Sequence, residues 1–448
     1  MLTFTHSRAH LSAFRLRWTP RRWGFRIAIA LLGLLIAIAS ANRGPARASF
    51  ETIAPQIYGP QTYEIVSAVP HVANGQPSPE TGSFTQQHSE IRGAWLTNID
   101  SGVLFSTSQT VSGVERLAQW GLNTIYPTVW NWGYSLYPSP VAEATTGIAV
   151  DPHPGLADRD LLAELTDLGH DAGMAVIPWF EFGLMTPSYS ELARQHPQWL
   201  AQRQDGSQLF MQGRHPRVWL NPLHPEVRTF FVDLVTEVAL TYPIDGIQFD
   251  DHFSWPVEFG YDPYTVEQYR QSHGDRYPPA DAHDPDWMAW RADQLTSLMG
   301  EIVAAVARAR PGAAVSLSPN PLPFAYEQYL QAWDQWQARG WIDQLIVQIY
   351  RPTVASFAEE LDRLVAKGVQ AYSRVGVGIL AGLKNRPLAP DLIAQQVAAV
   401  HARGLDGVSF FFFESMRDDA FAPLFSSKSG RLKLGHAKSG SQRSAVEG

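Results

Sequence analysis

Between residues 90 and 425 the chain alternates short apolar runs with longer amphipathic segments. Each apolar run predicts a buried strand, and the amphipathic segment after each of the first seven runs predicts a helix that covers it. The predicted strands are Ile91–Ile99, Asn123–Trp130, Ala175–Phe182, Gly246–Asp250, Ala314–Ser318, Gln344–Ile349, Arg374–Leu380 and Gly407–Phe413. The predicted helices are Val111–Trp120, Asp158–Ala172, Pro225–Tyr242, Asp286–Arg310, Ala325–Arg339, Val354–Lys367 and Pro390–Arg403.

Eight such units predict an α/β fold of the (β/α)8 TIM barrel type. The alternative, an open doubly wound sheet, normally has a glycine-rich phosphate turn after its first strand. No such turn follows Leu96 here, so we favour the barrel. Barrel enzymes carry their chemistry at the carboxyl ends of the strands. The two long connections on that face, Gly183–His224 and His252–Pro285, are therefore expected to wall the substrate cleft.

Residues 1–48 have the parts of a secretory signal peptide. Several arginines precede an apolar run from Ile27 to Ala41, and Ala46-Arg47-Ala48 has the small residues of a cleavage site. The pattern predicts export to the periplasm or the extracellular space. The apolar run is short for a bilayer span. Membrane contact is thus expected only transiently through the leader, and an uncleaved anchor is the alternative.

The remaining segments and the charge balance limit the function further. Residues 49–89 are predicted to be a linker or N-terminal arm, 90–425 the barrel, and 426–448 a disordered tail. The chain has no cysteine, which excludes disulfides and thiolate metal sites. Without residues 1–48 it has 27 basic against 43 acidic side chains, a net charge of −16. Such a surface repels nucleic acid. The oligomeric state is left open.

Three carboxylates end predicted strands and are the predicted catalytic residues. Asp250 and Asp251 end the fourth strand, where barrel side chains point into the cleft. Adjacent strand residues point to opposite faces, so Asp251 reaches the cleft only where the strand frays into the loop. Glu181 stands between Phe180 and Phe182, and such apolar surroundings raise a carboxyl pKa and suit a general acid. Each of the three could instead cap a loop or pair with an arginine.

Five motifs follow one another along the chain over roughly residues 90–415. They are Glu90–Thr97, Asn123–Pro127, Trp179–Gly183, Trp219–Pro222 and Asp245–Phe253. Together they resemble the bacterial glycosyl hydrolase-like family 10, a family of barrel proteins of which some are linked to cell-wall glycan. The resemblance implies a hydrolase that acts on a glycan. It implies no firm assignment of catalytic residues.

Other residues near strand ends are predicted to contact the substrate. Arg92 is expected to pair with a carboxylate, although a purely structural ion pair would explain it equally well. Asn320 offers a donor, and Asp100 and Glu414 offer acceptors. His252 could shape the pKa of its neighbours, bind a hydroxyl or ligate a metal. The His-x-x-x-His pair of metal-dependent deacetylases occurs only in the leader, so neither a metal nor a cofactor is predicted.

Aromatic residues are predicted to stack on the C–H faces of sugar rings. The chain has 15 Trp, which is rich for its length. Some of the candidates are expected to lie in the core instead. The candidates at strand ends and in the long loops are Trp130, Trp132, Tyr134, Trp179, Trp219, Trp255 and Tyr350.

These features predict an exported glycoside hydrolase that cleaves a polysaccharide, preferentially the N-acetylhexosamine glycan of peptidoglycan. Residues 245–250 echo the fourth strand of chitinases, which use the substrate acetamido group as nucleophile. Those enzymes have a glutamic acid where this chain has His252, so this chain lacks that acid. One of the two adjacent aspartates could instead orient an acetamido group while its neighbour protonates the leaving oxygen. Retention or substrate assistance is favoured over inversion. A catalytically inactive glycan-binding barrel is the alternative.

Overall fold

The computed structural model describes residues 90–383, 386–416 and 421. Apart from Gln212–Arg214, these residues belong to one compact unit. The predicted signal peptide, the linker or arm, and the predicted tail all lie outside the described residues. Within the described part, no helix has the length and apolarity that crossing a membrane requires.

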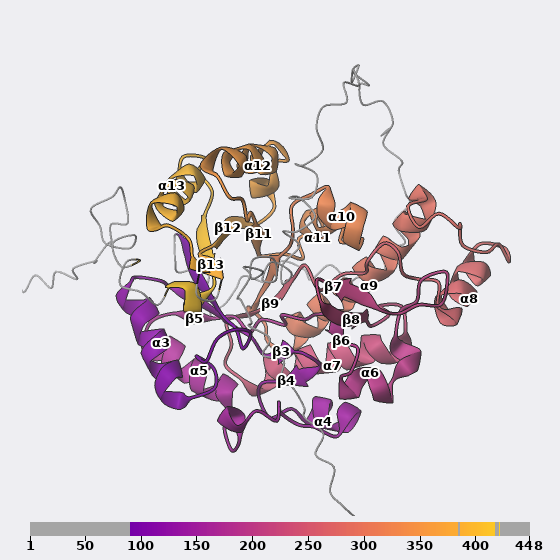
Figure 1. Cartoon of the computed structure of the whole chain (residues 1–448), viewed down its shortest axis with the longest axis horizontal. Coiled ribbons are helices and arrows are strands. Elements are labelled where there is room, and N and C mark those ends of the chain that lie inside the picture. Colours follow the sequence, from indigo (N-terminus) through magenta and orange to yellow (C-terminus); the bar gives the residue numbers. More distant parts are fainter. Residues whose placement is uncertain (1–89, 384–385, 417–420, 422–448) are drawn as a thin grey trace, which may run out of the picture. The chain divides into compact units, whose positions relative to one another are not determined.

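Eight parallel strands form the inner sheet (Figure 1). The sheet order is β5-β2-β1-β15-β12-β11-β10-β9. Trp179 forms bridges with Thr128 and Gln248, which bring the segment after β5 against β9 and nearly close the sheet. The predicted (β/α)8 TIM barrel is thus confirmed. The strands are β1 (Ile91–Leu96), β2 (Thr124–Pro127), β5 (Ala175–Val176), β9 (Gly246–Asp250), β10 (Ala314–Ser318), β11 (Gln344–Gln348), β12 (Arg374–Leu380) and β15 (Gly407–Phe411).

Helices cover the outside of the sheet. The predicted helix over 325–339 is two helices, because Leu330 adopts a left-handed φ of 53° and ends the first. Among the described residues after β15 there is a short 3-10 helix, Phe413–Met416. The helices are α3 (Thr107–Gln119), α5 (Leu161–Asp171), α7 (Pro225–Thr241), α9 (Pro285–Ala309), α10 (Phe324–Tyr329), α11 (Trp333–Ala338), α12 (Val354–Ala366) and α13 (Pro390–His401).

The second and third strands are shorter than predicted. Pro127 and Pro178 have no amide hydrogen to donate to a neighbouring strand. Beyond them the chain forms additional elements that shape the loops. These are β3 (Trp130–Asn131), β4 (Tyr134–Ser135), α4 (Pro140–Thr146), β6 (Met185–Pro187), α6 (Glu191–Gln195), β7 (Phe210–Gln212), β8 (His215–Trp219), α8 (Pro263–Ser272), β13 (Gly382–Leu383) and β14 (Arg386–Pro387).

A layer of hydrogen-bonded side chains fills the barrel interior. Trp95 donates from Nε1 to Gln248 Oε1 at 2.6 Å, and Gln248 donates to Ser316 at 2.9 Å. Gln344 Oε1 accepts from Ser316 at 3.0 Å and from Tyr126 at 2.9 Å. All five side chains are buried, so losing one partner would leave a buried polar group unpaired. The layer fixes Gln248, and with it the strand that carries Asp250.

Candidate active site

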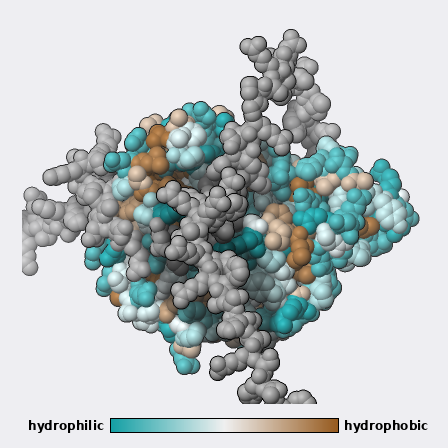
Figure 2. All heavy atoms as spheres, viewed as in Figure 1, coloured by the Kyte–Doolittle hydropathy of each residue, from teal (hydrophilic) through white to brown (hydrophobic). Residues whose placement is uncertain are grey.

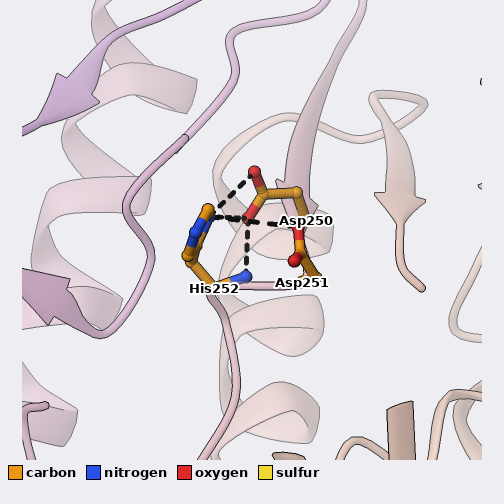
Figure 3. A group of neighbouring side chains, drawn as sticks. All are labelled: Asp250, Asp251 and His252. Carbon is orange, nitrogen blue, oxygen red and sulfur yellow. Dashed lines mark hydrogen bonds and ion pairs between the residues drawn. The ribbon is translucent and has the colours of Figure 1, made fainter. Parts of the chain in front are cut away.

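Asp250, Asp251 and His252 lie together where β9 ends, and the Asp250 carboxylate faces the His252 imidazole (Figure 3). Asp250 is only 2% exposed. Its Oδ1 accepts the backbone N–H of His252 at 2.8 Å and lies 3.2 Å from the imidazole Nδ1. Its Oδ2 accepts from the indole Nε1 of Trp179 at 3.2 Å. The carboxylate therefore has polar partners on both oxygens.

Glu181 reaches the same end of the barrel from the segment after β5. Its Oε2 accepts three hydrogen bonds, from Thr97 Oγ1 at 2.7 Å, Thr128 Oγ1 at 2.8 Å and Asn131 Nδ2 at 2.9 Å. No described residue donates to Oε1. We call these three donors the Glu181 cradle. All of them are uncharged, and together they fix the orientation of the carboxyl group.

The surroundings of Glu181 favour its protonated form. Burial raises the pKa of Glu181 to about 7. The bonds from Thr97 and Thr128 lower it, the charge of Asp250 raises it, and the charge of His252 lowers it. Neutral donors stabilise the carboxylate less than a cation would, so burial wins. The group is poised to exchange a proton near neutral pH.

Asp250 and His252 form a charged pair. Burial raises the pKa of Asp250 to about 6, although the charge and hydrogen bonds of His252 pull it down. Burial alone would lower the pKa of His252, but Asp250 and Asp251 outweigh it and raise that pKa to about 9. At neutral pH the imidazolium therefore keeps Asp250 ionised.

Asp251 is held by two amide side chains from neighbouring strand ends. Its Oδ2 accepts from Asn320 Nδ2 at 2.9 Å and its Oδ1 from Gln348 Nε2 at 3.0 Å. Gln331 fixes the loop behind the site, because its Nε2 donates to the backbone carbonyls of Asp250 and Phe253 at 2.8 and 2.9 Å. Both predicted aspartates thus have defined orientations.

Asp250, Asp251 and His252 also have side chains of the types that bind metal ions. Among the described residues they form the one such group, and their ligand atoms lie within 4.8 Å of one another. However, His252 Nδ1 lies 3.0 Å from the backbone carbonyl oxygen of Glu181. That oxygen can only accept, so Nδ1 carries a hydrogen and offers no lone pair to an ion. Both oxygens of Asp251 already accept amide hydrogens. The donor set fits a hydrogen-bonded group better than a metal centre.

Arg92 lies at the opposite end of the barrel from the three acids, which corrects its prediction as a substrate contact. Its Nη1 donates to Glu90 Oε2 at 3.1 Å and its Nε to the Gly121 carbonyl at 2.6 Å. Glu90 also contacts His401 Nε2 at 2.9 Å. Arg92 thus has the structural ion pair that the sequence left as the alternative.

Three of the predicted sugar platforms lie in the hydrophobic core. Trp130, Trp219 and Trp255 are at most 1% exposed. Trp130, for instance, packs edge-on against Phe230 and Phe231. Since their ring faces are covered by protein, the prediction that they line the cleft is corrected for these three residues.

The remaining predicted residues are spread over the end of the barrel that carries Asp250 and Glu181. Trp179 and Tyr350 are buried and pack near Phe411, with ring centroids 6.3 and 6.0 Å from it. Tyr134 donates its hydroxyl to Glu191. The roles of Trp132, Asp100 and Glu414 remain predictions. Trp132 is partly exposed, Asp100 is exposed in the loop after β1, and Glu414 is half-buried in the last 3-10 helix.

Sequence reasoning missed the Glu181 cradle. Thr97, Thr128 and Asn131 follow the first two strands. Their position at strand ends, the feature that singled out the acids, was the available signal. Hydroxyl and amide residues are common in loops, however, so this signal alone would not have distinguished them.

Comparison with known proteins agrees with the fold. The family model described as Glycosyl hydrolase-like 10 matches residues 90–399. The chain belongs to this family. The glycosyl hydrolase DigH of Escherichia coli (strain K12) is 28% identical over 318 residues, which cover 61% of this chain and 69% of that protein.

Solved structures of glycoside hydrolases share the fold of this glycosyl hydrolase-like 10 protein. The glycoside hydrolase domain of PgaB (BpsB) from Bordetella bronchiseptica superposes with a TM-score of 0.57 at 14% identity, covering 76% of this chain and 100% of that one. The α-L-fucosidase isoenzyme 2 from Paenibacillus thiaminolyticus gives 0.55 at 18% identity, covering 75% and 48%. At these identities the likeness shows the fold alone.

Proposed function

We propose that this protein is an active glycoside hydrolase in which Glu181 is the proton donor. The observation that carries the proposal is the Glu181 cradle. The cradle gives the buried carboxyl group three hydrogen bonds from neutral donors, which orient it without forcing it into its charged form. A glycosidase needs such a carboxylic acid to protonate the departing oxygen.

The cradle also supports a position for the proton. All three donors point at Oε2, so the proton resides on Oε1, the oxygen that receives no hydrogen bond from the described residues. In the reaction Oε1 gives this proton to the glycosidic oxygen as the bond from that oxygen to the anomeric carbon breaks. Glu181 is left as a carboxylate that the cradle stabilises. A water then supplies the hydroxyl of the anomeric carbon and returns a proton to the site.

Asp250 supplies the negative charge that the reaction needs. Its pairing with His252 keeps it ionised at pH values where Glu181 still holds its proton. A carboxylate in this state stabilises the positive charge that develops at the anomeric carbon, either directly or through an acetamido group of the substrate. Asp251, held by Asn320 and Gln348, orients a hydroxyl or an acetamido N–H.

The substrate proposed is the β-1,4-linked N-acetylhexosamine glycan of peptidoglycan. Two adjacent carboxylates suit an N-acetylated sugar, because its acetamido group needs an acceptor for its N–H. The leader-like first 48 residues support export, which would bring the protein to this glycan. The acidic chain disfavours recognition of polyanions by charge, so binding relies on hydrogen bonds and aromatic contacts.

The test is incubation with purified glycans, including peptide-free peptidoglycan strands, and product masses as the readout. We expect cleavage of N-acetylated glycan and a loss of about 10²–10⁴ in Asp250→Asn. Activity only on glucans would overturn the substrate. Binding of glycans without cleavage of any would overturn the hydrolase in favour of a glycan-binding barrel.

A further inference from the structure

The hairpin β3–β4 has an unusual residue in its turn. Asn131 pairs with Tyr134, so the loop consists of Trp132 and Gly133 alone. Both have positive φ, 56° and 82°, the signs of a type I′ turn. The first position of this turn favours asparagine, aspartate or glycine, and a bulky residue there is strained. A tryptophan at this position requires an explanation other than the turn itself.

The indole of Trp132 is also partly exposed. Large hydrophobic side chains that are exposed in the described part of the chain are few and scattered, and the surface in Figure 2 is mainly hydrophilic with separate hydrophobic patches. Trp132, at 39% exposure, is the one tryptophan among them. The fold therefore accepts both backbone strain and exposure at this residue. Such outliers concentrate at sites that bind ligands. The other exposed large hydrophobic residues of the described part are Tyr189, Leu209, Met211, Leu240, Tyr277 and Tyr372.

The turn is joined directly to the proposed acid. Asn131, the residue before Trp132, is fully buried and donates from Nδ2 to Glu181 Oε2 at 2.9 Å and to Asn98 Oδ1 at 2.6 Å. The exposed tryptophan and a donor of the cradle are thus adjacent in the chain. The hairpin therefore places the backbone of Trp132 next to a residue that contacts Glu181.

The hairpin is held rigidly in this position. A Cβ added at Gly133 would lie 2.7 Å from Thr186 Oγ1, so the turn packs closely on the segment after Glu181. The Tyr134 hydroxyl donates to Glu191 on the same segment. A ring on a fixed backbone loses little freedom when a ligand binds.

We propose that Trp132 is the platform of a glycan subsite next to the scissile bond. The ligand is a neutral or N-acetylated pyranose ring whose C–H face lies on the indole. The location relative to the scissile bond rests on the proposed role of Glu181. The hairpin thereby has two functions, because Asn131 orients the acid while Trp132 binds the sugar that the acid serves.

Binding is measured by isothermal titration calorimetry in the Glu181→Gln background, which separates it from turnover. The probes are β-1,4-linked N-acetylglucosamine oligomers of increasing length and matching glucose oligomers. Trp132→Asn retains the turn, since asparagine is favoured there. We expect it to weaken binding of the longer oligomers roughly three- to tenfold, the size of one aromatic contact. Trp132→Phe should recover part of this loss.

The matched control is Tyr372→Ala, which removes an exposed aromatic ring before β12, at the opposite end of the barrel. It should bind every oligomer as the parent does. Parent-like binding by Trp132→Asn, or no binding of any oligomer by the Glu181→Gln protein, would overturn the subsite. The proposed function is judged separately by cleavage in the parent. If the parent cleaves glycan but binding does not depend on Trp132, only the subsite is refuted. If binding depends on Trp132 but the parent cleaves no glycan, only the proposed hydrolase activity is refuted.

Discussion

Glu90 and Glu181 are two glutamates at opposite ends of the same barrel, and their surroundings affect them in opposite ways. Glu90 precedes β1 and contacts Arg92 and His401. Burial raises its pKa, but the two basic partners together outweigh burial and hold the pKa below its usual range. Glu181 has three hydrogen-bond donors, none of them charged, and burial raises its pKa to about 7.

The difference shows that a satisfied carboxyl group is not necessarily a structural one. Arg92 and His401 fix the position of Glu90 and hold its pKa below the usual range, so it joins β1 to α13 through His401 and stays ionised at neutral pH. Neutral donors fix only the position of Glu181 and leave its charge free to change. The charge of the partners, rather than their number, separates the two roles.

The largest expected effect is on turnover. Glu181→Gln should reduce kcat/KM by about 10²–10⁴, because an amide cannot donate the proton while its oxygen can still accept from the cradle. Glu90→Gln, the same change at the other end, should stay within a few-fold of the parent. Steady-state kinetics on the best glycan of the panel measures both. Equal losses in the two variants would abolish the distinction between the two ends.

The pH dependence follows from the same pKa values. Asp250 must be ionised and Glu181 protonated, so kcat/KM should rise with pH up to about 6 and fall above about 7, by about tenfold per pH unit on each limb. Glu90→Gln should keep both limbs. A profile that stays flat from pH 7 to about pH 9 would show that Glu181 does not act as an acid.

Stability should respond in opposite directions at the two ends. The folded pKa of Glu181 is raised, so its contribution to stability is complete below the unfolded pKa and is lost as pH rises through about 7. At about pH 9, Glu181→Gln should therefore have a free energy of unfolding roughly 2–4 kcal/mol higher than the parent, measured by denaturant unfolding. Glu90, whose folded pKa is lowered, stabilises above its unfolded pKa. Glu90→Gln should be less stable than the parent at neutral pH, and the reverse order in these denaturation curves would contradict the account.

The smallest expected effect concerns His252. Its positive charge lowers the pKa of Asp250 strongly and that of Glu181 less, so His252→Asn should move the acidic limb of the pH profile upward by more than the alkaline limb. A fixed acidic limb in the same kinetic titration would mean that another group controls it. Because kcat at the optimum changes for many reasons, the position of the limb is the informative quantity.

The sequence predicted the barrel because each strand is a compact apolar run, and it predicted Asp250 and Glu181 because they end such runs. It could not predict the cradle, since Thr97, Thr128 and Asn131 meet Glu181 only after the strands are arranged. Nor could it separate Trp130 from Trp132. These residues are two positions apart, and only the turn shows that one ring enters the core and the other remains partly exposed.

The most direct test of Glu181 as proton donor uses two substrates that differ only in their leaving group. In an aryl glycoside the leaving group is an acidic phenol, which departs without being protonated. In an oligosaccharide the leaving group is a sugar hydroxyl, which needs a proton to depart. Glu181→Gln should therefore retain most of the activity of the parent toward the aryl glycoside and lose about 10²–10⁴ toward the oligosaccharide. Equal losses toward both substrates would contradict the assignment of Glu181 as the acid.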